Sequence, residues 1–115
     1  MNIVVNVITG IVALLHTYFL ILEMFLWDKP MGLSVFHNSA EFATQSKTLA
    51  ANQGLYNGFL AAGLIWGLFA VSPVKIFFLS CVIIAGIFGG FTVSKRIFYI
   101  QAAPAIVALV LVLVA

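Results

Sequence analysis

Residues 3–27, IVVNVITGIVALLHTYFLILEMFLW, form an apolar run that contains a single charged side chain, that of Glu23. A helix needs about 20 residues to cross a hydrocarbon layer of about 30 Å, and this run is longer than that. It lacks the basic start of a signal peptide and exceeds the usual length of its apolar region, so we expect a retained span. The run therefore predicts a helix that lies in lipid.

Three more apolar runs follow, over residues 49–71, 76–94 and 97–115. The breaks between the runs are Asp28-Lys29-Pro30, Ser72-Pro73 with Lys75, and Lys95-Arg96. The last two breaks are short, which favours antiparallel helix hairpins. We predict an all-α membrane protein, in which residues 1–115 form one four-transmembrane-helix bundle.

The composition supports a membrane protein and excludes several other classes. Of the 115 residues 64% are hydrophobic and 7% charged, and the mean hydropathy is +1.24. A soluble domain carries roughly a quarter charged residues. The single Cys81 excludes an intramolecular disulfide, and the formal charge of +2 is too small to predict a nucleic-acid partner. The expected partner is the lipid bilayer.

The basic residues predict an orientation. Lys29, Lys47, Lys95 and Arg96 fall on one side of the predicted bundle and Lys75 on the other. Positive charges favour the cytoplasmic side. We therefore expect the linker after the first span and the turn after the third span in the cytoplasm, with both termini outside.

The connection from Asp28 to Thr48 is long enough to hold structure of its own. Asn38-Ser39-Ala40-Glu41 resembles a capping box, which predicts that a helix begins near Ser39. This helix either lies at the interface, as a short interfacial helix between spans one and two, or runs straight into span two. The aromatic side chains of Trp27, Phe36 and Phe42 suit the headgroup region. Anchoring and a gating lid are both open as roles for this segment.

Polar side chains inside the spans are costly, so each requires a partner or a purpose. His16 and Glu23 share one stripe of the first span, two helical turns apart. Further polar side chains in the same leaflet or close to it are those of Asn52, Gln53, Tyr56, Asn57 and Gln101. We predict that these seven residues form a ligand-binding pocket near the cytoplasmic interface. The alternative is that they only hydrogen-bond one helix to another.

Glycine spacing and one proline carry further predictions. Gly54 and Gly58, Gly63 and Gly67, and Gly86 and Gly90 each match the small-xxx-small pattern, which allows helices to approach closely. We expect packing seams inside one chain, while a homodimer through these faces stays open. Pro104 lies inside the last span, where it either frees a backbone carbonyl near Gln101 or kinks the helix.

Motifs of established chemistry are missing from the sequence. It contains no zinc-protease, nucleophile-elbow or phosphate-loop motif and no cysteine pair. We therefore expect no cofactor and no metal site, and we assign no catalytic residue.

The motif residues resemble one known family. The segment from His16 to Trp27, Pro30 with Gly32, and above all the string LAANQGLYNGFLAAG at residues 49–63 are similar to the domain of unknown function 1304. The resemblance extends through all four predicted spans and includes Gln101 and Pro104. It implies a small four-helix protein of the bacterial inner membrane and draws attention to Glu23, but it implies no reaction.

Three functions are compatible with this pattern. The first is binding or transport of a small molecule or a proton, with Glu23 as the titratable centre. The second is an intramembrane enzyme that acts on a lipid or isoprenoid, in which Glu23 and His16 move protons. The third is an accessory subunit in which the polar residues serve packing alone.

Overall fold

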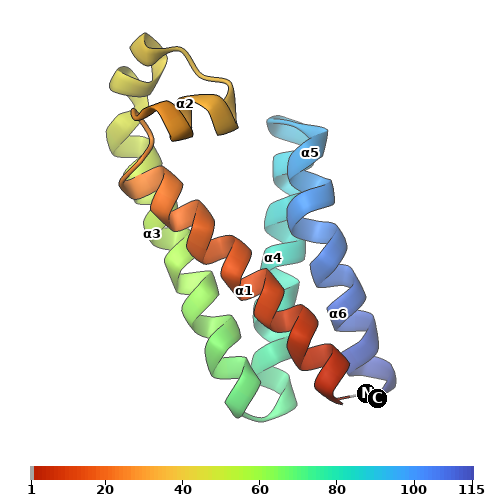
Figure 1. Ribbon diagram of the computed structural model, residues 1–115. Coiled ribbons are helices and arrows are strands. Elements are labelled where there is room, and N and C mark those ends of the chain that lie inside the picture. Colours follow the sequence, from red (N-terminus) through yellow and green to blue (C-terminus); the bar gives the residue numbers. More distant parts are fainter. Residues whose placement is uncertain (1) are drawn as a thin grey trace. The chain divides into compact units, whose positions relative to one another are not determined.

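The computed structural model describes residues 2–115, and all regular elements in this range are helical. They are α1 (Asn2–Met24), α2 (Pro30–Phe36), α3 (Ala40–Phe69), α4 (Ser72–Thr92), α5 (Lys95–Ile97), the π-helix η1 (Phe98–Ala102) and α6 (Ala103–Val114) (Figure 1). The prediction of an all-α protein is confirmed.

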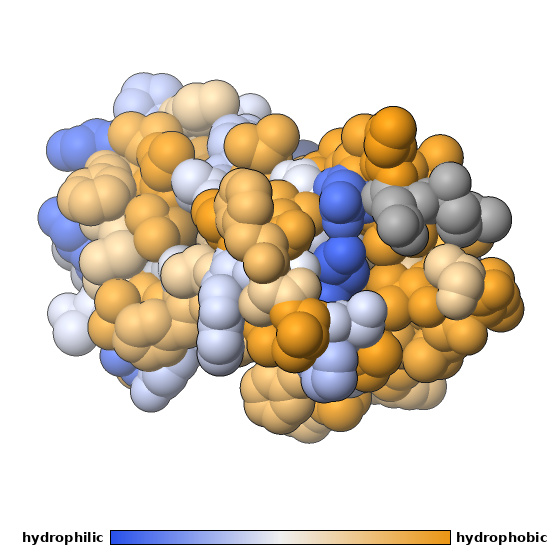
Figure 2. Space-filling model, turned by 90° about the horizontal axis from the view of Figure 1, so that it is seen from below, coloured by the Kyte–Doolittle hydropathy of each residue, from blue (hydrophilic) through white to orange (hydrophobic). Residues whose placement is uncertain are grey.

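Three stretches are long and apolar enough to cross a membrane, namely Ile3–Met24, Ser72–Thr92 and Lys95–Val114. Large apolar side chains cover much of the surface, as Figure 2 shows for one face, and Phe69 and Phe91 are 86% and 87% exposed. Helices that are apolar on all sides suit lipid better than water. The long helix α3 is not among the three, because the side chains of Asn52, Gln53 and Asn57 dilute its apolar character.

The chain folds as two compact units. The core unit holds residues up to 15 and 60–115, and the hairpin unit holds residues 16–59. In Figure 1 the start of α1 and the end of α6 lie at the same end of the core unit as the turn from α3 into α4. The core unit thus contains the start of α1, the end of α3 and all of α4, α5, η1 and α6.

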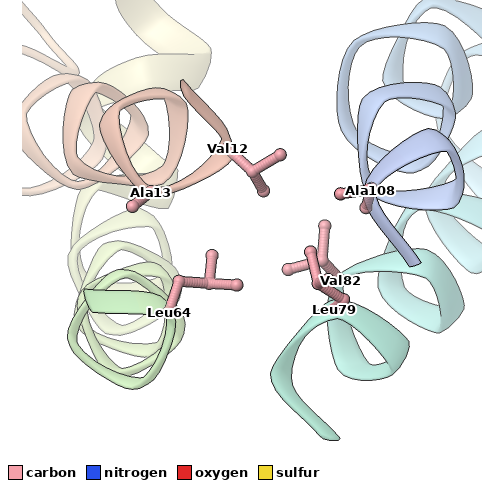
Figure 3. Packing of buried hydrophobic residues seen from close by; sticks show 7 residues of the cluster. Val12, Ala13, Leu64, Leu79, Val82 and Ala108 are labelled. Atoms are coloured by element: carbon pink, nitrogen blue, oxygen red, sulfur yellow. The ribbon is translucent and has the colours of Figure 1, made fainter. Parts of the chain in front are cut away.

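A cluster of small and branched side chains lies inside the core unit (Figure 3). Its buried members are Val12, Ala13, Leu64, Leu79, Val82, Ala105 and Ala108, and they come from α1, α3, α4 and α6. Nearby, the Lys75 ammonium donates a hydrogen bond of 2.6 Å to Asn6 Oδ1, which joins α4 to α1. The pair gives the cation a polar partner at the packed surface between the two helices.

Glycines allow the helices of the core unit to approach each other closely. A Cβ atom added to Gly86 would lie 2.8 Å from both the backbone nitrogen and the Cβ of Ala102, so α4 and η1 nearly touch there. The neighbouring helices also fill the space beside Gly63, Gly67, Gly89 and Gly90. The prediction of packing seams inside one chain is confirmed at these glycines.

Two helix boundaries differ from the predicted ones, one because a proline starts the helix and the other because a serine caps it. The predicted link Ser72–Lys75 lies inside α4, with Pro73 in the first turn, where a missing N–H costs nothing. Lys95 and Arg96 were predicted as a turn, yet they form the first turn of the last helix, where Ser94 Oγ accepts a hydrogen bond of 3.2 Å from the Arg96 N–H.

The last helix is not broken by Pro104, but the helical turn that precedes this proline is wider than an α-helical turn. Residues 98–102 form a π-helical turn, and the Ala103 N–H donates to the Phe98 carbonyl. A proline ring clashes with the carbonyl four residues earlier, and a wider turn moves that carbonyl aside. Pro104 therefore remodels one turn, and the helix continues as α6.

The seam at Gly86 predicts unequal effects of two glycine-to-alanine changes. Gly86→Ala should lower the free energy of unfolding by about 1 to 3 kcal/mol, since the new methyl group meets a backbone atom that cannot move away. Gly10→Ala should raise it by up to about 1 kcal/mol, because nothing lies within 4 Å of the new atom and alanine favours a helix. Thermal unfolding in detergent, followed by circular dichroism, measures both. Equal midpoints for the two variants would contradict the seam.

Candidate functional site

In the hairpin unit α1 and α3 pack against each other through two glycines. A Cβ on Gly54 would lie 2.6 Å from Met24 Cγ and 3.1 Å from Glu23 Cβ, and one on Gly58 would lie 2.6 Å from Leu20 Cδ1. These two glycines were predicted as a seam, and the contacts confirm it. The close approach brings the end of α1 within side-chain reach of the first half of α3.

A carboxylate and a carboxamide meet at this seam. Asn57 Nδ2 donates a hydrogen bond of 2.5 Å to Glu23 Oε1, between residues that lie far apart in the sequence. Asn57 is only 5% exposed, and Glu23 is half-buried. The bond therefore joins the charged side chain of α1 to a buried donor on α3, and it is the centre of the candidate site.

The polar residues of α1 follow one side of the helix. Asn6, Thr9, His16 and Glu23 recur at intervals of three and seven residues, which keeps them on one stripe. Thr9 and His16 are fully buried. The His16 ring packs edge-on against the ring of Phe19, with 5.6 Å between the ring centroids. The predicted shared stripe of His16 and Glu23 agrees with the helix that the structure shows from Asn2 to Met24.

Within the hairpin unit the other predicted residues of α3 are not buried against α1 in the way that Asn57 is. Asn52, Gln53 and Tyr56 lie on the exposed side of α3, where Tyr56 is 55% exposed and its ring packs against that of Phe59. Gln101 belongs to the core unit, half-buried on η1. The buried face of α3 runs through Ala50, Gly54 and Asn57, and Gln53 is exposed beside it. Gly54 packs against α1, so the face of α3 that carries Gly54 and Asn57 is the one that meets Glu23. A ligand-binding role for these residues stays a prediction.

Two contacts beyond the end of α1 were missed from the sequence. Trp27 Nε1 donates to Ser46 Oγ at 3.0 Å, and the Lys47 ammonium lies 3.2 Å from the Asp28 carboxylate. The hydrogen bond with Lys47 holds the pKa of Asp28 below its ordinary value. Both contacts join the two ends of a connection whose path depends on α2, so sequence spacing carries no signal for them.

The connection itself corrects one prediction. The short helix between α1 and α3 is α2, Pro30–Phe36, rather than a segment that begins near Ser39. Pro30 starts it after an extended Lys29, and Gly32 packs directly on the backbone of Leu26 and Trp27.

The residues at the predicted capping box instead begin α3. Ser39 Oγ accepts a hydrogen bond of 3.1 Å from the Phe42 N–H, so Ser39 rather than Asn38 caps this helix. Of the two alternatives for a helix that begins here, the structure shows the one that runs on without a break, from Ala40 to Phe69. The position of α2 relative to a membrane interface stays a prediction.

No group of metal ligands accompanies the Glu23–Asn57 pair among the described residues. Among residues 2–115 no three His, Cys, Asp or Glu side chains gather closely enough to hold a metal ion. Two surface hollows of about 310 and 250 Å³ lie in the core unit, and their linings are almost wholly apolar. What the pair can do is accept a proton or hydrogen-bond a small polar group.

Fold and site define a small all-helical protein with helices suited to a membrane. The chain belongs to the family described as "Protein of unknown function (DUF1304)", whose members it matches over residues 10–113. It is 32% identical over 115 residues to the "Uncharacterized protein YpaA" of Lactococcus lactis subsp. lactis (strain IL1403), with 96% of this chain and 97% of that protein covered. No solved structure matches it. The comparisons thus confirm the resemblance seen in the motifs, and they carry no activity.

The hydrogen bond at the seam predicts different effects for two asparagines on the same helix. Asn57→Ala should lower the free energy of unfolding by about 1 to 3 kcal/mol, because Glu23 loses its donor. Asn52→Ala is the matched control, since Asn52 is exposed, and it should change stability little. Thermal midpoints in one detergent compare them. A larger loss for Asn52→Ala would mean that the bond does not hold α1 to α3.

The lowered pKa of Asp28 predicts an acid-sensitive connection. The folded state favours the Asp28 carboxylate, so the contact with Lys47 contributes fully at neutral pH. It weakens as the pH falls below the ordinary value of about 4. In a Trp66→Phe background, fluorescence of Trp27 should report this loosening. Adding Asp28→Asn should remove the transition, and an unchanged transition would assign it to another group.

Proposed function

We propose that this chain spans the bacterial inner membrane four times and binds a small molecule or a proton at the Glu23–Asn57 pair. Support for the fourth span comes from α3, whose 30 residues measure roughly 45 Å, more than the thickness of a hydrocarbon core. Its polar residues occupy its first half, and residues 60–69 are apolar apart from glycine. In this arrangement Lys29, Lys47, Lys95 and Arg96 face the cytoplasm, and both termini lie outside.

The observation that carries the proposal is the hydrogen bond from a buried carboxamide to a carboxylate on a helix that has no other acidic or basic side chain apart from His16. A charge in a membrane helix is costly, by about 2.5 to 3.5 kcal/mol at its centre on insertion scales. Helix pairing alone is achieved at lower cost with uncharged side chains. The presence of an ionisable side chain where an uncharged one would serve therefore supports a role in binding.

The chemistry of the pair supports a proton or a polar solute as its ligand. Ionised Glu23 accepts hydrogen bonds only, whereas protonated Glu23 also donates one. The carboxamide of Asn57 donates through its nitrogen and accepts through its oxygen, so a rotation of this group preserves the bond in both states. The site can thus change protonation or admit a hydrogen-bonding ligand without separating α1 from α3. The buried His16, on the same side of α1, offers a second proton-exchanging group.

A thermal-shift screen over a pH series tests this function. The purified chain is tested with small polar molecules, quinones and lipids, alongside Glu23→Gln and the exposed-site control Asn52→Ala. A ligand that binds the folded state raises the unfolding midpoint by mass action. We expect a shift that is present in the wild type and the control and absent in Glu23→Gln, or a pH dependence of the midpoint that this variant alone removes.

If no ligand shifts the midpoint, and Glu23→Gln matches the wild type at every pH, the pair serves packing and the chain is an accessory subunit. If a lipid added to the protein is chemically converted and Glu23→Gln stops the conversion, the chain is an enzyme.

A further inference from the structure

A second site lies in the core unit, where α4 ends and the last helix begins. A groove of about 250 Å³ is lined by Ile87, Gly90, Phe91, Lys95, Phe98 and Tyr99. These residues come from the last turns of α4, from α5 and from the π-helical η1. The groove is apolar except for the Lys95 side chain and the polar tip of Tyr99.

Local backbone structure creates this groove. Gly90 lacks a side chain, and an added Cβ would lie 2.8 Å from Phe98 Cβ, so the floor of the groove is formed where α4 and η1 approach closely. The wide turn of η1 carries Phe98 and Tyr99, whose rings meet edge-on at 5.5 Å. Phe91 and Tyr99 are exposed and form its walls. The hollow therefore belongs to a packed helix pair and does not depend on a mobile loop.

The groove begins at the expected membrane surface. The apolar stretches Ser72–Thr92 and Lys95–Val114 meet here, so the short break between them marks the end of both spans. Lys95 is exposed at this break, whereas Ile87 lies more than one turn before the end of α4 and therefore deeper. Aromatic side chains and a lysine are typical of the lipid–water boundary. One end of the groove thus meets headgroups and the other meets acyl chains.

The charge at the mouth of the groove has no counter-charge in its unit. Residues up to 15 and 60–115 contain no Asp or Glu. Within residues 2–115 the Lys95 side chain makes no hydrogen bond or ion pair, and Arg96 adds a second positive charge beside it. The complementary ligand is an anion that carries an apolar tail and arrives from the bilayer.

We propose that this groove binds one anionic phospholipid, with the phosphate at the Lys95 ammonium and one acyl chain along Ile87, Gly90 and Phe91. A lysine ammonium pairs with phosphate as a compact charge, and the aromatic walls bury the first carbons of the chain. The site is separate from the Glu23–Asn57 pair and does not depend on its function.

Native mass spectrometry of the full chain in a neutral detergent tests the proposal. The protein is mixed with equal amounts of phosphatidylglycerol and phosphatidylcholine that carry the same acyl chains. The wild type should retain more phosphatidylglycerol, and Lys95→Gln should reduce that preference roughly fivefold, the effect of one basic residue at an anionic surface. Lys29→Gln is the matched control, since Lys29 is an exposed lysine that does not line the groove. It should leave the preference unchanged.

Two more probes separate the groove from general surface charge. Phe91→Ala should weaken retention of both lipids. It removes a wall of the groove that the bound acyl chain contacts, whichever of the two lipids is bound. Glycerol 3-phosphate, which has no acyl chain, should compete poorly with phosphatidylglycerol. Equal retention of the two lipids by the wild type, equal losses in the two lysine variants, or effective competition by glycerol 3-phosphate would each overturn the proposal. Circular dichroism confirms that each variant is folded.

Discussion

Close packing at glycines is the constraint on which the rest of this molecule depends. Inside a bilayer the lipid tails are as apolar as leucine, so burying apolar side chains supplies little drive for helix pairing. Contact between backbones must supply it instead. Gly54 and Gly58 bring α3 against α1 in the hairpin unit, while Gly86 brings α4 against η1 in the core unit. A side chain at Gly54 or Gly86 would meet backbone atoms of the neighbouring helix, whereas one at Gly58 would meet the end of the Leu20 side chain.

The candidate site follows from the same constraint. Glu23 and Asn57 meet because Gly54, one turn before Asn57, fits against Glu23 and Met24. The glycine shortens the distance between the helices, and the short distance makes a direct hydrogen bond feasible. The polar contact and the tight packing are therefore one feature, which ties any ligand chemistry at Glu23 to the geometry of the seam. Just beyond the end of α1, Trp27 contacts Ser46 and Asp28 contacts Lys47. These two contacts join the ends of the connection between α1 and α3.

Several features could be predicted because they depend on local chemistry. Apolar length identified the helices α1, α4 and the last span, and glycine spacing identified the seams. Where prediction failed, the decisive contact was distant in sequence. Asn38 and Ser39 are both good caps, and the path of the chain selected Ser39. Gln53 and Asn57 are equally polar, but the face of α3 that meets α1 decided between them. The short helix between α1 and α3 was predicted to begin near Ser39 rather than at Pro30, because Pro30 was interpreted only as the end of a span.

The sequence by itself determined that this protein is helical, that its surface suits lipid, and that it belongs to its family, because composition and periodicity act through each residue and its near neighbours. Only the tertiary structure decided that Glu23 pairs with Asn57, that Lys75 pairs with Asn6, and that Lys95 stands at the mouth of an apolar groove. Each of these contacts depends on which faces of the helices pack together. That choice depends on how well side chains and glycines from segments far apart in the chain pack against each other.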